Sequence, residues 1–315
     1  MLLLPDTGLS LAAGCWLLLD VAFLLALIIH LLGDCGRRYS TLYAVFEDII
    51  RYGKTKLGRR PAWLHWFDLP KRWFWHFYLL SVIWNGALLG FIVRSLLLGV
   101  QLPQWIQLLF NFFHKDSEQK IYDEELSTLL ALSLLWIHSL RRLFECFYVS
   151  VYSGGVINLA HYCLGVFYYF LLGITVLDHA ELDYNKVTVT EILQQLDWCH
   201  LAGCLFYIWA SLLQYRSHVI LANLRKDKSG KIVTMNHVIP SGDWFETISC
   251  PHYFAELCIY TSIGFLFGLD HLTWWLLVLF VFLNQSSAAI LCHEFYHQKF
   301  DPYPAHRKAF IPYLF

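Results

Sequence analysis

Seven long apolar stretches are the feature that most limits what this chain can fold into. A helix of about 20 mostly apolar residues is long enough to cross a bilayer, and only helices and closed barrels satisfy their backbone hydrogen bonds there. We therefore predict an all-α integral membrane protein with about seven transmembrane helices. The stretches cover roughly residues 9–32, 74–100, 126–148, 155–177, 197–215, 253–269 and 272–292.

The composition agrees with burial in lipid. Of the 315 residues, 57% are hydrophobic and 15% are charged, whereas soluble domains have about 25% charged residues. Aromatic residues make up 17% of the chain and include 13 Trp, which suits side chains that anchor at a membrane surface. The net charge of −1 argues against nucleic acid as a partner.

The charges of the connecting segments alternate along the chain and predict which side each segment faces. Segment 33–72 carries nine Lys or Arg against four Asp or Glu, and segment 101–125 carries two against five. Segment 178–197 is again acidic, whereas segment 216–252 and the tail 294–315 are basic. Because basic segments remain in the cytosol, we expect a lumenal N-terminus and a cytosolic C-terminus.

We expect two parts within one integrated membrane domain. Residues 1–125 hold the first two spans and the basic cytosolic loop 33–72. Residues 126–315 form a helical module with the cytosolic loop 216–252 and the cytosolic tail 294–315.

Cysteine and histidine spacing predicts neither a disulfide framework nor a metal site. The nine Cys are scattered without any C-x-x-C, which is typical of reduced thiols. His293 and Glu294 do not open an H-E-x-x-H motif, since the next His stands at 297. No G-x-G-x-x-G follows a strand pattern, so a bound nucleotide would be held by loops and helix ends.

Two polar clusters at the predicted cytosolic face are the candidate functional residues. His138, Arg142 and Glu145 share one helical face because they are four and three residues apart. They form either an anchor for a phosphate-bearing ligand or a snorkelling helix end. His293 and Tyr296 share a face at the end of the last stretch; the alternative there is an ordinary basic tail at the headgroups.

Several motifs carry a resemblance to a known family. With them the chain resembles the steroid 5-alpha-reductase family, most closely its polyprenal (polyprenol) reductase subfamily, the third type. The motifs are F-E-D-I-I-R-Y-G-K-T-K at 46–56, F-D-L-P-K-R-W-F at 67–74, L-W-I-H-S-L-R-R-L-F-E-C at 135–146, H-V-I-L-A-N-L-R-K at 218–226, I-P-S-G-D-W-F-E at 239–246 and the tail from His293 to Phe315.

The resemblance implies a seven-helix, multi-pass fold in the endoplasmic reticulum membrane, with a reductase module in residues 126–315. It also implies NADPH as cofactor and reduction of the α-isoprene C=C double bond of polyprenal to dolichal. This reaction belongs to dolichol biosynthesis, which serves protein N-glycosylation. Whether 3-oxo-Δ4-steroids are also substrates is left open.

The resemblance assigns roles to individual residues. Asp68 stands in D-L-P where the steroid enzymes have a Glu that polarises the substrate carbonyl, and their carbonyl-binding Tyr falls at Ser139. Asp68, Tyr296 and His293 are the candidate catalytic residues. The positions that match the nucleotide pocket or its wall are Arg142, His218, Arg225, His252, Tyr253, Glu256, Tyr296 and Arg307.

The chemistry of such a reduction defines what these residues must do. Hydride adds to the β carbon of an enal and charge collects on the oxygen, so a donor is needed there. Asp68 can serve only if burial keeps it protonated, and Tyr296 competes for this role. An alcohol does not activate the double bond, so we predict polyprenal, not polyprenol, as the direct substrate.

The expected partners are a polyisoprenoid substrate and membrane lipids, with no nucleic acid and no obligate protein partner. Two other functions stay open. A membrane enzyme similar to isoprenylcysteine methyltransferases would bind S-adenosylmethionine and need no phosphate-binding Arg set. A transporter or other non-catalytic protein would have ionisable groups near the bilayer midplane, where only Asp20 fits.

Overall fold

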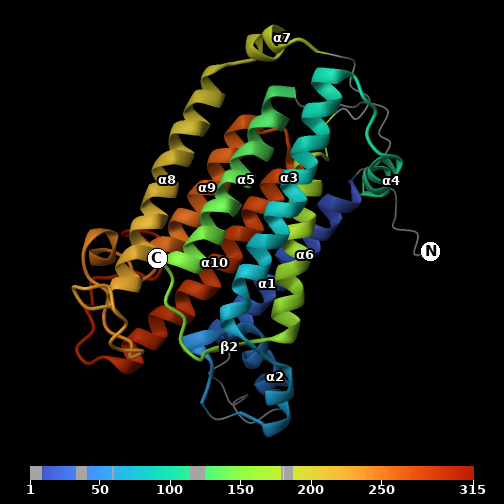
Figure 1. Ribbon diagram of the computed structural model, residues 1–315. Coiled ribbons are helices and arrows are strands. Elements are labelled where there is room, and N and C mark those ends of the chain that lie inside the picture. Colours follow the sequence, from blue (N-terminus) through green and yellow to red (C-terminus); the bar gives the residue numbers. More distant parts are fainter. Residues whose placement is uncertain (1–8, 33–40, 59, 114–124, 179, 181–186) are drawn as a thin grey trace.

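A computed structural model describes residues 9–32, 41–58, 60–113, 125–178, 180 and 187–315, and seven long helices account for most of them (Figure 1). Each helix occupies one of the seven apolar stretches. They are α1 (Leu11–Leu32), α3 (Trp75–Leu98), α5 (Glu125–Tyr148), α6 (Leu159–Val176), α8 (Trp198–Asn223), α9 (Pro251–Phe267) and α10 (Leu272–Lys299).

Four of these helices, α1, α3, α6 and α10, are long and apolar enough to cross a membrane. The other three are shorter or more polar. α9 has only 17 residues, α5 carries Arg141, Arg142 and Glu145, and α8 contains polar residues near its C-terminal end. The structure therefore agrees with a helical membrane protein, while seven spans and the orientation stay predictions. Segments 33–40, 114–124 and 181–186, on which part of the orientation argument rests, lie outside the described residues, as does Cys35.

Shorter elements connect the long helices. The α-helices among them are α2 (Thr41–Ile50), α4 (Gln104–Phe113) and α7 (Val189–Gln194), and the 3-10 helices are η1 (Gly53–Thr55), η2 (Ala62–Phe67), η3 (Lys71–Phe74) and η4 (Asp243–Glu246). A small antiparallel ladder is an addition to the predicted all-α fold. Its strands are β1 (Asp68–Pro70) and β2 (Val156–Asn158), with Asp68 opposite Asn158.

The long helices pack pairwise into one bundle, α8 along α9, α3 along α5, and α1 along α10. Aromatic side chains fill the centre: the Trp16 and Phe280 rings are 5.4 Å apart, and Trp16 Nε1 donates to Thr175 Oγ1 at 2.8 Å. Buried aromatic rings whose N–H groups have hydrogen-bond partners are typical of a well-packed protein core. These two contacts of Trp16, with α10 and with α6, hold the N-terminal helix to the C-terminal part of the chain.

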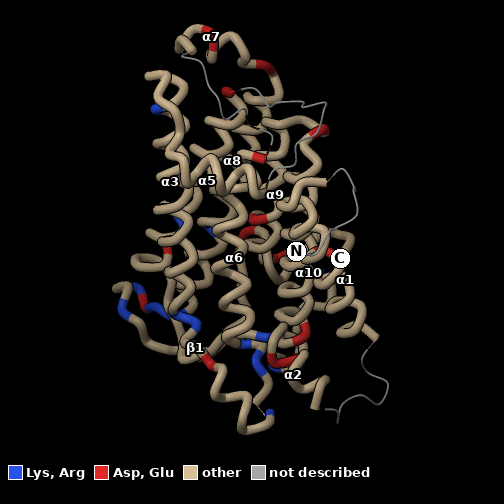
Figure 2. Tube along the Cα trace, turned by 90° about the vertical axis from the view of Figure 1, so that its right-hand side faces the viewer, with Lys and Arg blue, Asp and Glu red and all other residues tan. Residues whose placement is uncertain are grey.

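The two ends of the bundle differ in charge. Figure 2 shows Lys and Arg concentrated toward the end that carries β1 and α2, and Asp and Glu around α7 at the opposite end. The first end also contains the segment between α8 and α9 (Figure 1). The candidate functional residues lie toward this basic end.

Candidate functional site

A cavity of about 380 Å³ lies inside the bundle toward its basic end. This volume is within the range of about 300–1,000 Å³ that is common for small-molecule sites. Side chains from all seven long helices line it, together with the segments before α3, after α5 and after α8. Its charged and imidazole lining comprises Lys54, Lys71, Arg142, His161, His218, Arg225, His237, His252 and Glu256.

At one end of the cavity, Arg142 is held by several partners. Its Nη2 donates to the Tyr78 hydroxyl at 3.1 Å and its Nη1 donates to Glu145, three residues further along α5. The Nδ1 atom of His218 lies 2.7 Å from both the Arg142 guanidinium and the Glu145 carboxylate. The Glu145 side chain is 0% exposed. The guanidinium is therefore fixed in direction by a buried ion pair.

Glu256 belongs to a second buried network beside this ion pair. Gln214 Nε2 donates to Glu256, and Arg141 Nη2 donates to Gln214 Oε1 at 2.6 Å. His138 Nε2 lies 3.4 Å from Glu256 Oε1. These contacts join α5, α8 and α9, so they fix the floor of the cavity.

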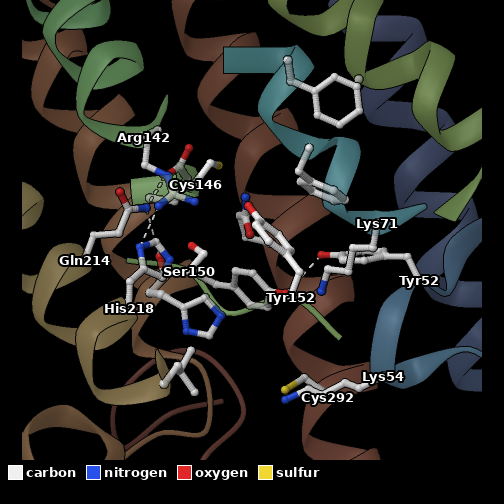
Figure 3. Close-up of a pocket in the computed structure, with 18 of the residues that line it drawn as sticks. Tyr52, Lys54, Lys71, Arg142, Cys146, Ser150, Tyr152, Gln214, His218 and Cys292 are labelled. Carbon is white, nitrogen blue, oxygen red and sulfur yellow. Dashed lines mark hydrogen bonds between the residues drawn. The ribbon is translucent and has the colours of Figure 1, made fainter. Parts of the chain in front are cut away.

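The opposite end of the cavity is built from lysines and aromatic rings. Lys54 Nζ donates to the Tyr296 hydroxyl at 2.8 Å, and the Tyr52 and Tyr253 hydroxyls are 3.1 Å apart. Figure 3 shows Arg142, Gln214 and His218 on one side, and Tyr52, Lys71, Lys54 and Cys292 on the other. Burial raises the pKa of Tyr52 to about 12, so this phenol remains protonated at neutral pH.

Arg225 and His237 close the cavity on the side of the segment after α8. Arg225 Nη1 donates to the Val151 carbonyl. Burial, followed by the charges of Lys54 and Arg225, lowers the pKa of His237 to about 4. The cationic groups of Lys54 and Arg225 near His237 make this part of the cavity favourable for an anionic group of a ligand.

The structure brings seven of the predicted site residues together around this cavity. They are Arg142, His218, Arg225, His252, Tyr253, Glu256 and Tyr296. Among the described residues, Asp68, His293 and Arg307 do not belong to the lining. Ser139, at the position of the family's carbonyl-binding Tyr, is buried and bonded to Ser81 Oγ at 2.6 Å.

Asp68 lies behind the cavity wall in an ion pair. Its carboxylate binds Arg60, which also donates to Asp48 Oδ1 at 2.6 Å, and its backbone belongs to the β1–β2 ladder. His65 Nδ1 is 3.3 Å from the same carboxylate. An acid so engaged has to leave Arg60 before it can donate a proton.

His293 and Arg307 hold the C-terminal tail against the cavity wall. His293 Nδ1 is 2.6 Å from Ser249 Oγ, which is 2.8 Å from the Tyr303 hydroxyl. The Tyr303 ring stacks on Tyr296 at 5.6 Å. Arg307 Nη1 donates to the Pro240 carbonyl at 2.7 Å, so it fastens the tail to the segment before α9.

The lining residues that were not predicted from the sequence include Tyr52, Lys54, Lys71 and Cys292. The first three lie in the motifs at 46–56 and 67–74, where their basic surroundings are typical of a solvated cytosolic loop. Their place in these motifs was the one sequence feature that could have indicated a role in the site. In the described part of the chain, no three His, Cys, Asp or Glu side chains form a metal site.

Comparisons with known proteins address the family. A family model described as 3-oxo-5-alpha-steroid 4-dehydrogenase matches residues 156–315. A polyprenal reductase of Xenopus tropicalis is 59% identical over 307 residues, which are 97% of this chain and 100% of the relative. The polyprenal reductase of Homo sapiens is 49% identical over 95% of this chain and 94% of the relative, and that of Danio rerio is 46% identical over 95% and 96%.

These matches confirm the resemblance that the motifs predict. The polyprenal reductases cover nearly the whole chain at 46% identity or more, and the family model covers its second half. The chain therefore belongs to the steroid 5-alpha-reductase family, and within it to the polyprenal reductases.

Proposed function

We propose that this protein is an oxidoreductase that uses NADPH to reduce the α-isoprene C=C double bond of polyprenal to dolichal. The observation that carries the proposal is the near full-length identity to polyprenal reductases. The reaction would serve dolichol biosynthesis for protein N-glycosylation, in the endoplasmic reticulum membrane. Reduction of 3-oxo-Δ4-steroids is a second activity to test, because the family model carries that name.

The apolar part of the cavity supports an isoprenoid substrate. Phe23, Leu164 and Phe280 line it from α1, α6 and α10, which are three of the helices able to span a membrane. A polyisoprenoid chain is insoluble in water, so its tail would remain in lipid beside these helices while the aldehyde enters the cavity. Membrane lipids and the substrate are the partners that we propose.

The polar part of the cavity fits a nicotinamide dinucleotide. Arg142 and Arg225 offer planar guanidinium groups, which suit phosphate oxygens. The buried His252 Nδ1 has no hydrogen-bond partner among the described residues, so it is available to a ligand. The residues that would hold the cofactor are Arg142, His218, Arg225, His252, Tyr253 and Glu256.

When bound, the cofactor supplies a hydride to the β carbon of the enal. The chain must then supply a proton at the carbonyl oxygen. Because the Tyr296 hydroxyl accepts a hydrogen bond from Lys54 Nζ, its own proton is available for donation. We assign this proton to Tyr296, and we assign Asp68, His293 and Arg307 to the support of the cavity wall.

The membrane topology belongs to the same proposal. Seven spans, a lumenal N-terminus and a cytosolic C-terminus would place loop 216–252 and tail 294–315 where NADPH is available. The two parts 1–125 and 126–315 would then share one membrane domain. Glycosylation acceptor sites test this: we expect modification of a site in segment 101–113 and none in segment 226–240, and the reverse pattern would contradict the orientation.

Purified protein in lipid nanodiscs tests the reaction. With NADPH we expect consumption of polyprenal and formation of dolichal, and no turnover of polyprenol when dehydrogenases are absent. Equal turnover of the alcohol would overturn the substrate assignment. Mass spectrometry of the ligand that co-purifies should identify NADP(H); S-adenosylmethionine in its place would indicate a methyltransferase.

A further inference from the structure

The amine of Lys71 differs from the other cationic groups of the cavity. In the described part of the chain, Lys54 donates to Tyr296, Arg142 to Glu145, and Arg225 to Val151. Lys71 Nζ has no such acceptor and no carboxylate within ion-pair distance among the described residues. It lies 5.1 Å from the centroid of the Tyr52 ring and 5.8 Å from that of Phe74.

The fold holds this side chain in place. Lys71 follows β1 directly, and its backbone N–H donates to the Gly155 carbonyl at 2.9 Å, next to the β1–β2 ladder. Gly53 has a φ of +57°, and a Cβ added there would lie 2.7 Å from Lys71 Cδ and 2.8 Å from Nζ. The backbone at Gly53 therefore leaves room for an extended lysine that reaches the cavity.

The surroundings suit a nucleophilic amine. Lys54 and Arg225 act on Lys71 as like charges and Cys292 acts in the opposite sense, while the Tyr52 and Phe74 rings lie beside its amine. A lysine that is desolvated or lies beside other cations is activated toward carbonyl carbons, and the product is a Schiff base. An aldehyde is the carbonyl that reacts most readily in this way.

We propose that Lys71 is a catalytic residue that forms a transient iminium with the aldehyde carbon of the substrate. The proposal deepens the proposed function, on which it rests for the enal. A conjugated iminium is positively charged and draws electrons from the double bond more strongly than the free aldehyde does. The faces of Tyr52 and Phe74 would stabilise this cation.

The covalent sequence begins with attack on the aldehyde and ends with the release of free Lys71. Lys71 Nζ attacks the aldehyde carbon. In this sequence the Tyr296 proton reaches the substrate oxygen before hydride transfer instead of after it, so the oxygen leaves as water. The β carbon accepts a hydride from the nicotinamide donor, which gives an enamine, and the α carbon then accepts a proton from water. Water hydrolyses the resulting iminium, so the saturated aldehyde leaves and Lys71 is restored.

Reductive trapping tests the bond without turnover. The full chain in nanodiscs, free of nucleotide, is incubated with farnesal, a short isoprenoid enal, and then treated with cyanoborohydride. We expect a secondary amine on the peptide that contains Lys71, found by peptide mass spectrometry. Farnesol is the control ligand, because an alcohol forms no iminium.

Variants separate the covalent role from a merely electrostatic one. Lys71→Arg keeps the positive charge but forms no iminium, so both Lys71→Arg and Lys71→Met should lose the adduct and about 100-fold or more in kcat. The matched control is Lys228→Met, which removes an exposed lysine in a turn. Nucleotide binding by each variant shows that it is folded.

The outcomes are distinguishable. If the adduct forms on Lys54 or Cys292, or if Lys71→Arg keeps its turnover, the proposal is wrong while the reductase function stands. If the wild-type protein turns over polyprenal and no adduct can be trapped, the proposal is also wrong. If the wild-type protein never reduces the enal, the proposed function itself fails.

Discussion

At one end of the cavity Arg142 meets Glu145, His218 and Tyr78, whereas at the other end the amine of Lys71 meets the faces of Tyr52 and Phe74. The first arrangement neutralises a buried charge within the protein. The second leaves the Lys71 amine without an acceptor among the described residues, so a ligand can supply one. We therefore expect the ion pair at the first end to serve stability and the orientation of Arg142 toward the cofactor, and Lys71 at the second end to serve the chemistry.

The largest effect should follow from breaking the ion pair at the first end. Glu145→Ala would leave Arg141 and Arg142 without their buried carboxylate, which costs about 3–5 kcal/mol of unfolding free energy. Thermal unfolding in nanodiscs measures this loss. Lys71→Met loses no hydrogen-bond acceptor and should unfold close to the wild type, so equal destabilisation of both variants would contradict the comparison.

His293→Ala should have the next largest effect, on turnover. It would leave Ser249 Oγ without the imidazole and free the Tyr303 ring that stacks on Tyr296. Because the Tyr303 ring then supports Tyr296 less firmly, we expect a fall in kcat with membrane insertion unchanged. Steady-state kinetics and a fractionation assay measure both. His306→Ala, an exposed tail residue, is the control, and full activity of His293→Ala would remove the tail from the site.

The smallest effect should come from Gly53→Ala. The added Cβ would meet the Lys71 side chain, and the positive φ adds about 1 kcal/mol of strain. We expect about a tenfold lower yield of the farnesal adduct, with nucleotide affinity at the Arg142 end unchanged. Gly58→Ala, where a Cβ meets nothing within 4 Å, is the control. A parallel loss of nucleotide affinity would mean that the two ends are not independent.

Hydropathy predicts where the long helices lie, because each of them is an unbroken apolar stretch. It does not predict the β1–β2 ladder, since three-residue strands carry no periodic signal and Asp68 pairs with a residue 90 positions away. Short amphipathic helices such as α4 fall below the length of a span, so they were included in connecting segments.

Some residues of the site could likewise be predicted from the sequence, and others could not. Arg142 and Glu145 could be predicted to meet because their spacing on a helix is local. The position of Lys54 and Lys71 in the cavity lining could not be predicted, since it depends on how the segment before α3 folds over α10 and β2. The role predicted for Asp68 rests on the motif alone. The sequence does not predict its ion pair with Arg60, which the structure shows.

The ladder also bears on how such enzymes can acquire new substrates. The family model begins at Val156, which is the first residue of β2, whereas Lys54, Asp68 and Lys71 all precede it. In the function that we propose, the part matched by the family model carries most of the side chains that would hold the cofactor, and the part before it contributes Lys54 and Lys71 to the cavity. A change of substrate that begins in the part before β2 therefore has to preserve the pairing of β1 with β2, because this ladder holds the segment that carries Lys71.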